Sequence, residues 1–145
     1  MRPDTWQKLE EMFARHPIMK AESVPYEEID ACAANIVFQL DYDYREFIHR
    51  YGGAIVGRFP VYGLRKAKPM GKEAESFLAI THHFRRQRWP GVDKWAVIST
   101  DHAGNPVGLD ADGRIWISDH DARAVQLLAD SFEGYVRKWC LRLPD

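Results

Sequence analysis

Five aspartates lie close together in the second half of the chain. They are Asp101, Asp110, Asp112, Asp119 and Asp121, in stretches that also carry the glycine, asparagine and proline typical of turns. If these turns meet at one end of a sheet, they form an acidic rim that speeds encounter with a basic partner. The alternative, which the sequence leaves open, is that each aspartate only bonds the backbone of its own turn.

Metal chemistry is poorly supported by the same residues. In a strand, Asp119 and Asp121 would point to one face and His120 to the other, which is poor geometry for shared ligands. The segment Asp110-Ala111-Asp112-Gly113 has the start of a calcium loop but lacks its third acidic position and closing glutamate. We therefore predict no metal site and no cofactor.

Nucleophilic catalysis is also poorly supported. Ser99, Ser118 and Ser131 have no glycine-flanked elbow, and neither Cys32 nor Cys140 belongs to a CxxC motif. No nucleophile stands at a readable spacing from a base. The sequence thus predicts a binding protein and not an enzyme, with both cysteines as reduced thiols on apolar helix faces.

Composition sets the class of protein. A chain of 145 residues is long enough for one domain with a real core, so we expect a single domain over residues 1–145. Its net charge of −1 gives no general attraction to nucleic acid or anionic membrane. The apolar runs are too short for a membrane span, and the N-terminus lacks the apolar stretch of a signal peptide. We expect a cytoplasmic protein.

Helical spacing of apolar residues predicts the elements of the first half. A helix over about residues 4–16 begins at Asp4 or Thr5. A second helix begins near Ser23, and its apolar stripe extends to Val37. A third, short helix is capped by Asp41 or Asp43 and ends at the glycine pair 52–53, where a left-handed residue is tolerated.

The rest of the chain reads mainly as strands. The first strand covers residues 54–59 and is followed by a helix over residues 72–88. Strands at 95–99, 106–109 and 114–118 are joined by tight turns, after which residues 119–123 leave the sheet. Asp130 and Glu133 have the spacing of a capping box for a last helix, on which Trp139 faces inward.

This order of elements indicates an α+β domain. Helices come first, then an antiparallel meander with one inserted helix, then a C-terminal helix. We expect a central, mainly antiparallel sheet of about four to six strands flanked by helices.

A resemblance to a known family is carried by an ordered set of short motifs. These are the helix start at residues 23–28, DYREF at 43–47, YGGA at 51–54, the strand at Trp95, GN at 104–105, LD at 109–110, GRIW at 113–116, DHD at 119–121, ADSF at 129–132 and YV at 135–136. The chain resembles the SUKH superfamily over about residues 20–140. The resemblance implies an α+β fold with a central antiparallel sheet and no shared catalytic residues.

The resemblance also implies a function. Bacterial members commonly act as immunity proteins that bind and neutralise a cognate polymorphic or contact-dependent toxin, often a nuclease. The alternative is a regulatory adaptor that binds a self protein, as eukaryotic members suggest. We expect a protein partner, no direct nucleic acid or membrane contact, and a monomer or weak dimer. The candidate partner-binding residues are Tyr62 and Trp116 as exposed aromatic anchors, with Asp101, Asp112 and Asp119.

Overall fold

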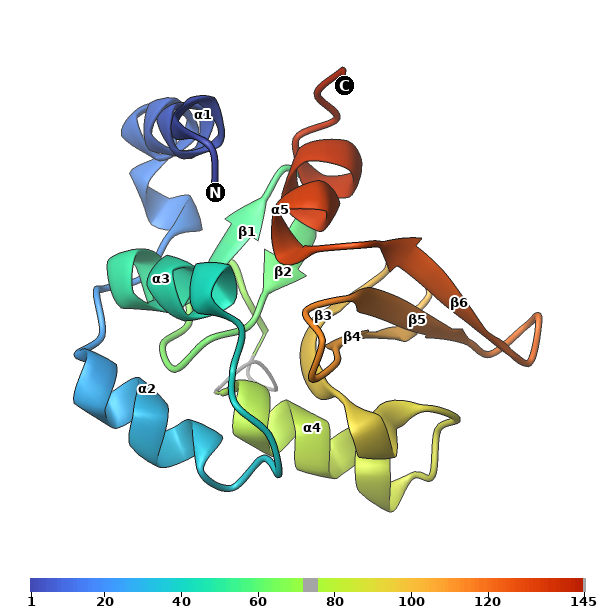
Figure 1. Cartoon of the computed structure of the whole chain (residues 1–145). Coiled ribbons are helices and arrows are strands. Elements are labelled where there is room, and N and C mark those ends of the chain that lie inside the picture. Colours follow the sequence, from blue (N-terminus) through green and yellow to red (C-terminus); the bar gives the residue numbers. More distant parts are fainter. Residues whose placement is uncertain (72–75, 145) are drawn as a thin grey trace.

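The computed structural model describes residues 1–71 and 76–144 (Figure 1). In chain order the elements are α1 (Pro3–Arg15), η1 (Pro17–Met19), α2 (Tyr26–Ala33), α3 (Tyr42–Tyr51), β1 (Ala54–Val56), β2 (Phe59–Val61), α4 (Phe77–Arg86), η2 (Val92–Lys94), β3 (Ala96–Thr100), β4 (Pro106–Leu109), β5 (Ile115–Asp119), β6 (Ala124–Ala129), α5 (Phe132–Tyr135) and the π-helical η3 (Val136–Cys140).

The strands form two antiparallel sheets, in the orders β1-β2 and β3-β4-β5-β6. This confirms the predicted α+β fold with helices at both ends of the chain. The two sheets are joined at one edge, because the Tyr62 amide donates to the Ile98 carbonyl at 2.7 Å. The Ser99 hydroxyl also donates to the Pro60 carbonyl, at 2.6 Å.

The predicted single strand over residues 54–59 is wrong, because the chain reverses there. Ala54 pairs with Val61 and Val56 with Phe59, so the segment is a hairpin. Gly57 has a φ of 63°, which suits the first turn position of a tight hairpin. A side chain there would meet the Cys140 carbonyl at 2.2 Å, so the turn also packs closely on η3.

The prediction that residues 119–123 leave the sheet missed a fourth strand. Asp119 ends β5, residues 120–123 form a turn outside the strands, and the chain returns as β6, which pairs with β5 from Asp119↔Ala124 to Ile115↔Ala129. The Asp119 carboxylate makes this turn by accepting from the amides of Asp121 and Ala122, at 3.0 and 3.1 Å. Because β6 is an edge strand with exposed apolar side chains, it lacks the alternation that marks a half-buried strand.

Helix ends were predicted with mixed success. Asp41 caps α3 as expected, accepting from the Tyr44 amide at 3.1 Å, and Gly52 ends that helix with a φ of 75°. The expected caps at Asp4, Thr5 and Ser23 are wrong: α1 and α2 begin after Arg2 and Pro25 without a side-chain cap. The inserted helix α4 begins at Phe77, and its predicted start at residue 72 lies outside the described residues.

The last helix is capped differently from the prediction. Ser131, not Asp130, accepts the amide of Gly134, at 2.9 Å. Glu133 is engaged elsewhere, because its carboxylate accepts from the hydroxyl of Thr5 at 2.9 Å. The widened turn of η3 leaves Trp139 exposed where an inward position was expected.

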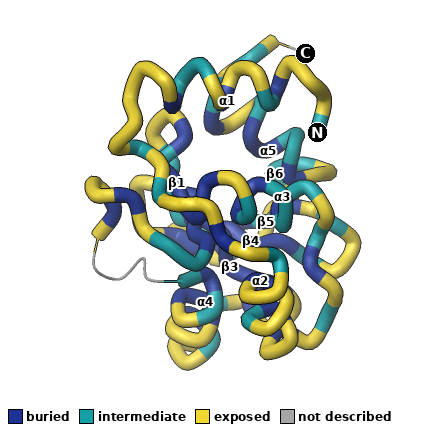
Figure 2. The backbone as a smooth tube through the Cα atoms, turned by 90° about the vertical axis from the view of Figure 1, so that its left-hand side faces the viewer, coloured by how far each residue is buried: buried dark blue, intermediate teal, exposed yellow. Residues whose placement is uncertain are grey.

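Aromatic side chains on α3 hold the helices to the sheet. Figure 2 shows buried backbone in the central strands and on the inner sides of the surrounding helices. Tyr44 is fully buried and its hydroxyl donates to the Tyr62 carbonyl. Its ring contacts Phe77 and Phe132 edge-on, while Tyr51 packs on Phe13 of α1. One aromatic cluster therefore fixes α1, α3, α4 and α5 around the same side of the fold.

The cap of α5 can be tested by two neighbouring substitutions. We expect Ser131→Ala to lower the free energy of unfolding by about 1 kcal/mol, because the Gly134 amide loses its acceptor. The matched control Asp130→Ala removes an exposed side chain and is expected to change it by less than about 0.5 kcal/mol. Urea denaturation followed by circular dichroism measures both, and a larger loss for Asp130→Ala would contradict the assignment.

Candidate protein-binding surface

The predicted acidic rim is divided between two ends of the four-stranded sheet. In a meander of four strands, the first and third turns lie at one end and the second turn at the other. Asp101 and Asp119 therefore share one end, where the His120 amide donates to Asn105 Oδ1 at 2.9 Å and joins the two turns. Asp112 lies in the turn at the opposite end, so the expectation of one continuous rim is wrong.

Most of the turn aspartates have a structural role. Asp101 Oδ1 accepts from the amides of Ala103 and Asn105 at 2.9 and 2.8 Å. Asp110 Oδ1 accepts in the same way from the amides of Asp112 and Arg114, at 2.8 and 2.9 Å. Asp112 differs, because its exposed carboxylate lies 3.8 Å from Arg114 and accepts no backbone bond among the described residues.

The two predicted aromatic anchors, Tyr62 and Trp116, differ in how far they are buried. Tyr62 is only 8% exposed, and its hydroxyl is hydrogen-bonded to Thr100 Oγ1 at 2.9 Å. Its predicted position as an exposed anchor is therefore wrong. Trp116 is half-buried, and its indole Nε1 donates to Asp110 Oδ2 at 2.8 Å, which ties the ring to the turn that carries Asp112.

Among the described residues, the most exposed large apolar side chain is Val37, which lies in the loop of residues 34–41 between α2 and α3. Helix α2 ends at Ala33, so the predicted helical stripe to Val37 is wrong. Ile36 and Leu40 anchor the loop in the core, whereas Val37 is 94% exposed and Tyr42 74% exposed. The sequence contained the signal for this surface, an apolar run next to a helix cap, but helical spacing assigned Val37 to the core.

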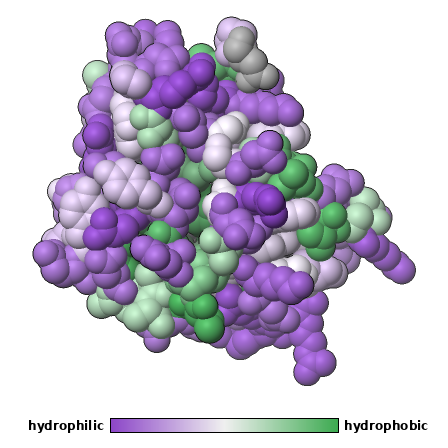
Figure 3. Space-filling view, in the orientation of Figure 1, coloured by the Kyte–Doolittle hydropathy of each residue, from purple (hydrophilic) through white to green (hydrophobic). Residues whose placement is uncertain are grey.

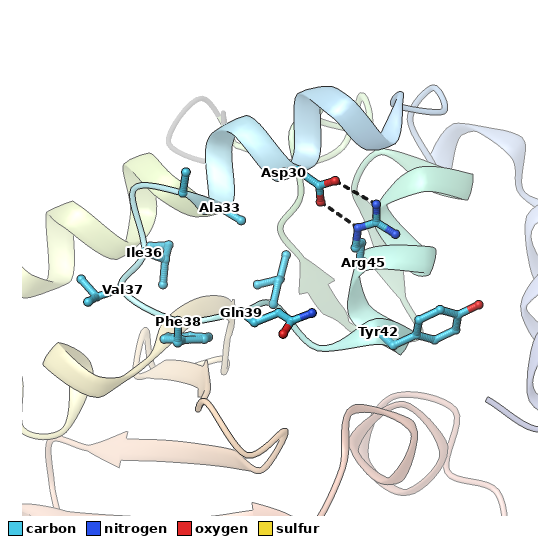
Figure 4. A pocket seen from close by; sticks show the side chains of 10 residues that line it. Asp30, Ala33, Ile36, Val37, Phe38, Gln39, Tyr42 and Arg45 are labelled. Atoms are coloured by element: carbon cyan, nitrogen blue, oxygen red, sulfur yellow. Dashed lines mark hydrogen bonds and ion pairs between the residues drawn. The ribbon is translucent and has the colours of Figure 1, made fainter.

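This loop borders a hollow of about 720 Å³ (Figure 4). Arg45 and Asp30 form one side of it, with Arg45 Nε and Nη2 donating to the carboxylate at 2.8 and 2.9 Å. These bonds hold the pKa of Asp30 below its ordinary value. The Arg45 guanidinium also lies 4.2 Å from the centre of the Tyr26 ring, so α2 and α3 are held together at the hollow.

The loop and the turn of residues 110–113 adjoin one another. A side chain at Gly113 would lie 3.1 Å from Asp41 Oδ1, so the N-cap of α3 touches the turn. Figure 1 shows this turn facing the loop, and Figure 3 shows apolar atoms gathered over the loop and over the β5–β6 side of the same face. We name the combined area the loop–turn surface, defined by Val37, Phe38, Tyr42, Asp112 and Trp116.

No three His, Cys, Asp or Glu side chains among residues 1–71 and 76–144 are grouped to hold a metal ion. The two cysteines are free, and burial raises the pKa of the Cys140 thiol to about 12 and also raises the pKa of the Cys32 thiol. Because the thiolate is the nucleophile, neither thiol is activated for attack.

A comparison with known protein families shows the family to which this chain belongs. Residues 24–138 match the SMI1 / KNR4 family (SUKH-1), which is well over half of the chain. The chain belongs to the SMI1 / KNR4 family. A comparison with curated proteins finds no match.

The matched part of this SUKH-1 protein includes the whole loop–turn surface. Helix α1 precedes the match but is bonded to its end, because Arg137 Nη1 donates to Asp4 Oδ2 at 2.9 Å and to Thr5 Oγ1 at 2.8 Å. In the described part of the SUKH-1 protein, no helix has the length and apolar character needed to cross a membrane.

Asp41 links α3 to the loop–turn surface, and its charge can be tested separately from its cap. Burial raises the pKa of its carboxyl above the ordinary value, so the charged form costs stability above that pKa. This cost disappears as the pH falls towards and below the ordinary value. We expect Asp41→Ala to lower the free energy of unfolding at pH 7 by about 1 kcal/mol, because the Tyr44 amide loses its cap.

Asp41→Asn is the matched variant, since asparagine caps a helix without the charge. We expect it to be at least as stable as the native protein at pH 7, and to lose that advantage as the pH falls to about 4. Thermal unfolding between pH 7 and pH 3 measures the difference. An Asn variant as unstable as the Ala variant at pH 7 would contradict this account of Asp41.

Proposed function

We propose that this SUKH-1 protein is an immunity protein, a non-enzymatic domain that neutralises a cognate bacterial toxin by covering its active face. The support is its family, whose members are associated with immunity to toxins. We place the protein in the cytoplasm as a single domain over residues 1–145. In this mechanism the protein covers the toxin's active face by contact alone, so it requires no reactive side chain.

The loop–turn surface is the observation that carries the proposal. Val37 and Tyr42 are largely exposed apolar and aromatic side chains beside a hollow. Ordered aromatic anchors of this kind dominate the energetics of many protein interfaces. The loop is held on both sides by buried Ile36 and Leu40, so little conformational entropy is lost when a partner binds.

The exposed carboxylate on the loop–turn surface indicates which kind of partner this surface favours. Asp112 is exposed on the loop–turn surface, where its carboxylate lies 3.8 Å from Arg114, and the net charge of the whole chain is −1. The Asp112 carboxylate therefore favours a partner with basic groups around its active face, as in enzymes that bind phosphate backbones. A nuclease domain is one toxin of that description.

The test begins with affinity capture of the tagged protein from its host, including cells grown with sister strains. The expected result is a stoichiometric partner that carries a toxin domain and loses its toxic activity when mixed one to one with this protein. Capture of a regulatory self protein, with no effect of deletion on sensitivity to neighbours, would replace the immunity proposal with the adaptor alternative.

The footprint is tested with single substitutions and that captured partner. We expect Tyr42→Ala to weaken the complex at least tenfold, because the exposed ring is a central anchor. Ile18→Ala is the matched control, since Ile18 is also exposed but lies on η1, away from the loop–turn surface. Surface plasmon resonance measures both, and equal affinities for the two variants would overturn the footprint.

Charge reversal tests which end of the sheet meets the partner. We expect Asp112→Lys to slow association at low salt, with the difference shrinking as added salt screens the charges. Asp121→Lys changes charge at an exposed position in the turn at the opposite end of the sheet and is expected to leave association nearly unchanged. Stopped-flow kinetics at two salt concentrations separates the cases, and the reverse ranking would move the footprint to the other end.

A further inference from the structure

Strand β6 leaves one edge of the four-stranded sheet open. The opposite edge, β3, is covered where the Tyr62 amide donates to the Ile98 carbonyl. Among the residues that the structure describes, no backbone group outside β5 is hydrogen-bonded to β6. Within residues 1–71 and 76–144, the one side chain hydrogen-bonded to the backbone of this edge is the Trp139 indole, which donates to the Leu128 carbonyl at 3.0 Å. Figure 1 shows β6 at the outside of the molecule.

The side chains of β6 suit strand pairing. Val125 and Leu127 are 39% and 46% exposed and, being two residues apart, lie on the same face of the sheet. Residues 124–129 contain no proline and no charge, the features with which proteins usually block an exposed edge. Opposite charges stand at the two ends, Arg123 and Asp130, and neither forms an ion pair in the described part of the chain.

We propose that β6 is a self-association edge on which a second copy of this chain pairs antiparallel, across a two-fold axis at Gln126. Two four-stranded sheets then become one continuous sheet. A two-fold axis places each residue opposite the one equally distant from Gln126. Val125 of each copy then lies opposite Leu127 of the other, and Arg123 stands at the end of β6 that is nearer to Asp130 of the other copy.

The second copy is favoured as the occupant because β6 complements itself. In this register the two exposed apolar side chains cover each other, the Gln126 amides meet, and the opposite end charges come near one another. The pairing is short, since Trp139 occupies the edge at Leu128. An interface of this length is well below the standard size of stable complexes, so the dimer is weak and forms at high protein concentration.

Two complementary variants test both the edge and the register. Sedimentation equilibrium of the native protein over a concentration series is expected to show a reversible monomer–dimer equilibrium. Val125→Lys alone and Leu127→Glu alone are each expected to weaken dimerisation at least tenfold. Each substitution places an unpaired charge in both Val125–Leu127 pairs of the dimer. A mixture of the two variants is expected to recover association, since the new lysine faces the new glutamate across the axis.

Control substitutions at Ile18 test whether the effects are specific to β6. Ile18→Lys, a charge at another exposed apolar position, on η1, is expected to leave association unchanged. Gln126→Cys, placed on the axis, is expected to form an intermolecular disulfide as oxidised glutathione is reduced, whereas Ile18→Cys is not.

A monomer at every concentration would overturn the proposal. So would a dimer that Val125→Lys does not weaken, or a mixture of the two variants that associates no better than either alone. A strand from the toxin partner on this edge would appear instead as a loss of toxin affinity in Leu127→Glu without any self-association of the native protein.

Discussion

The fold depends on the burial of Tyr44 at the centre of the molecule. Its ring contacts Phe77 of α4 and Phe132 of α5, and its hydroxyl donates to the Tyr62 carbonyl. Tyr62 in turn donates to β3, so one side chain connects the helical layer to the joint between the two sheets. Because a buried hydroxyl without a partner is costly, this position fixes the distance of α3 from both sheets.

The position of α3 then determines where the loop–turn surface lies. Asp41 at its N-terminus touches the turn at Gly113, and the loop before it is anchored by Ile36 and Leu40. Aspartate side chains in the turns fix the register of the hairpins. This register places the half-buried Trp116 on the same surface as the exposed Asp112. The loop–turn surface is thus a consequence of core packing and turn chemistry, in which the side chains of Val37 and Tyr42 are exposed. The open edge of β6 arises separately, because no element follows it in the sheet.

Much of the architecture could be predicted from the sequence because its signals are local. The cap at Asp41, the glycine stop at Gly52 and the turns at residues 101–105 and 110–113 all act within a few residues. The failures involve tertiary contacts. Glu133 bonds Thr5 of α1 and so leaves the cap of α5 to Ser131, and β6 hides its strand pattern because its apolar side chains are exposed. The role of Asp112 and Trp116 in partner binding stays a prediction, whereas Tyr62 is buried by a joint that no local pattern reveals.

The most direct test of the account is amide hydrogen exchange of the protein alone and in complex with its captured partner. Exchange reports local protection residue by residue, so it locates the contact without altering the chain. The account predicts slower exchange in residues 34–42 and 110–116, with residues 101–105 and 119–123 unchanged. Protection confined to those last two turns, at the opposite end of the sheet, would contradict the loop–turn surface as the site of recognition.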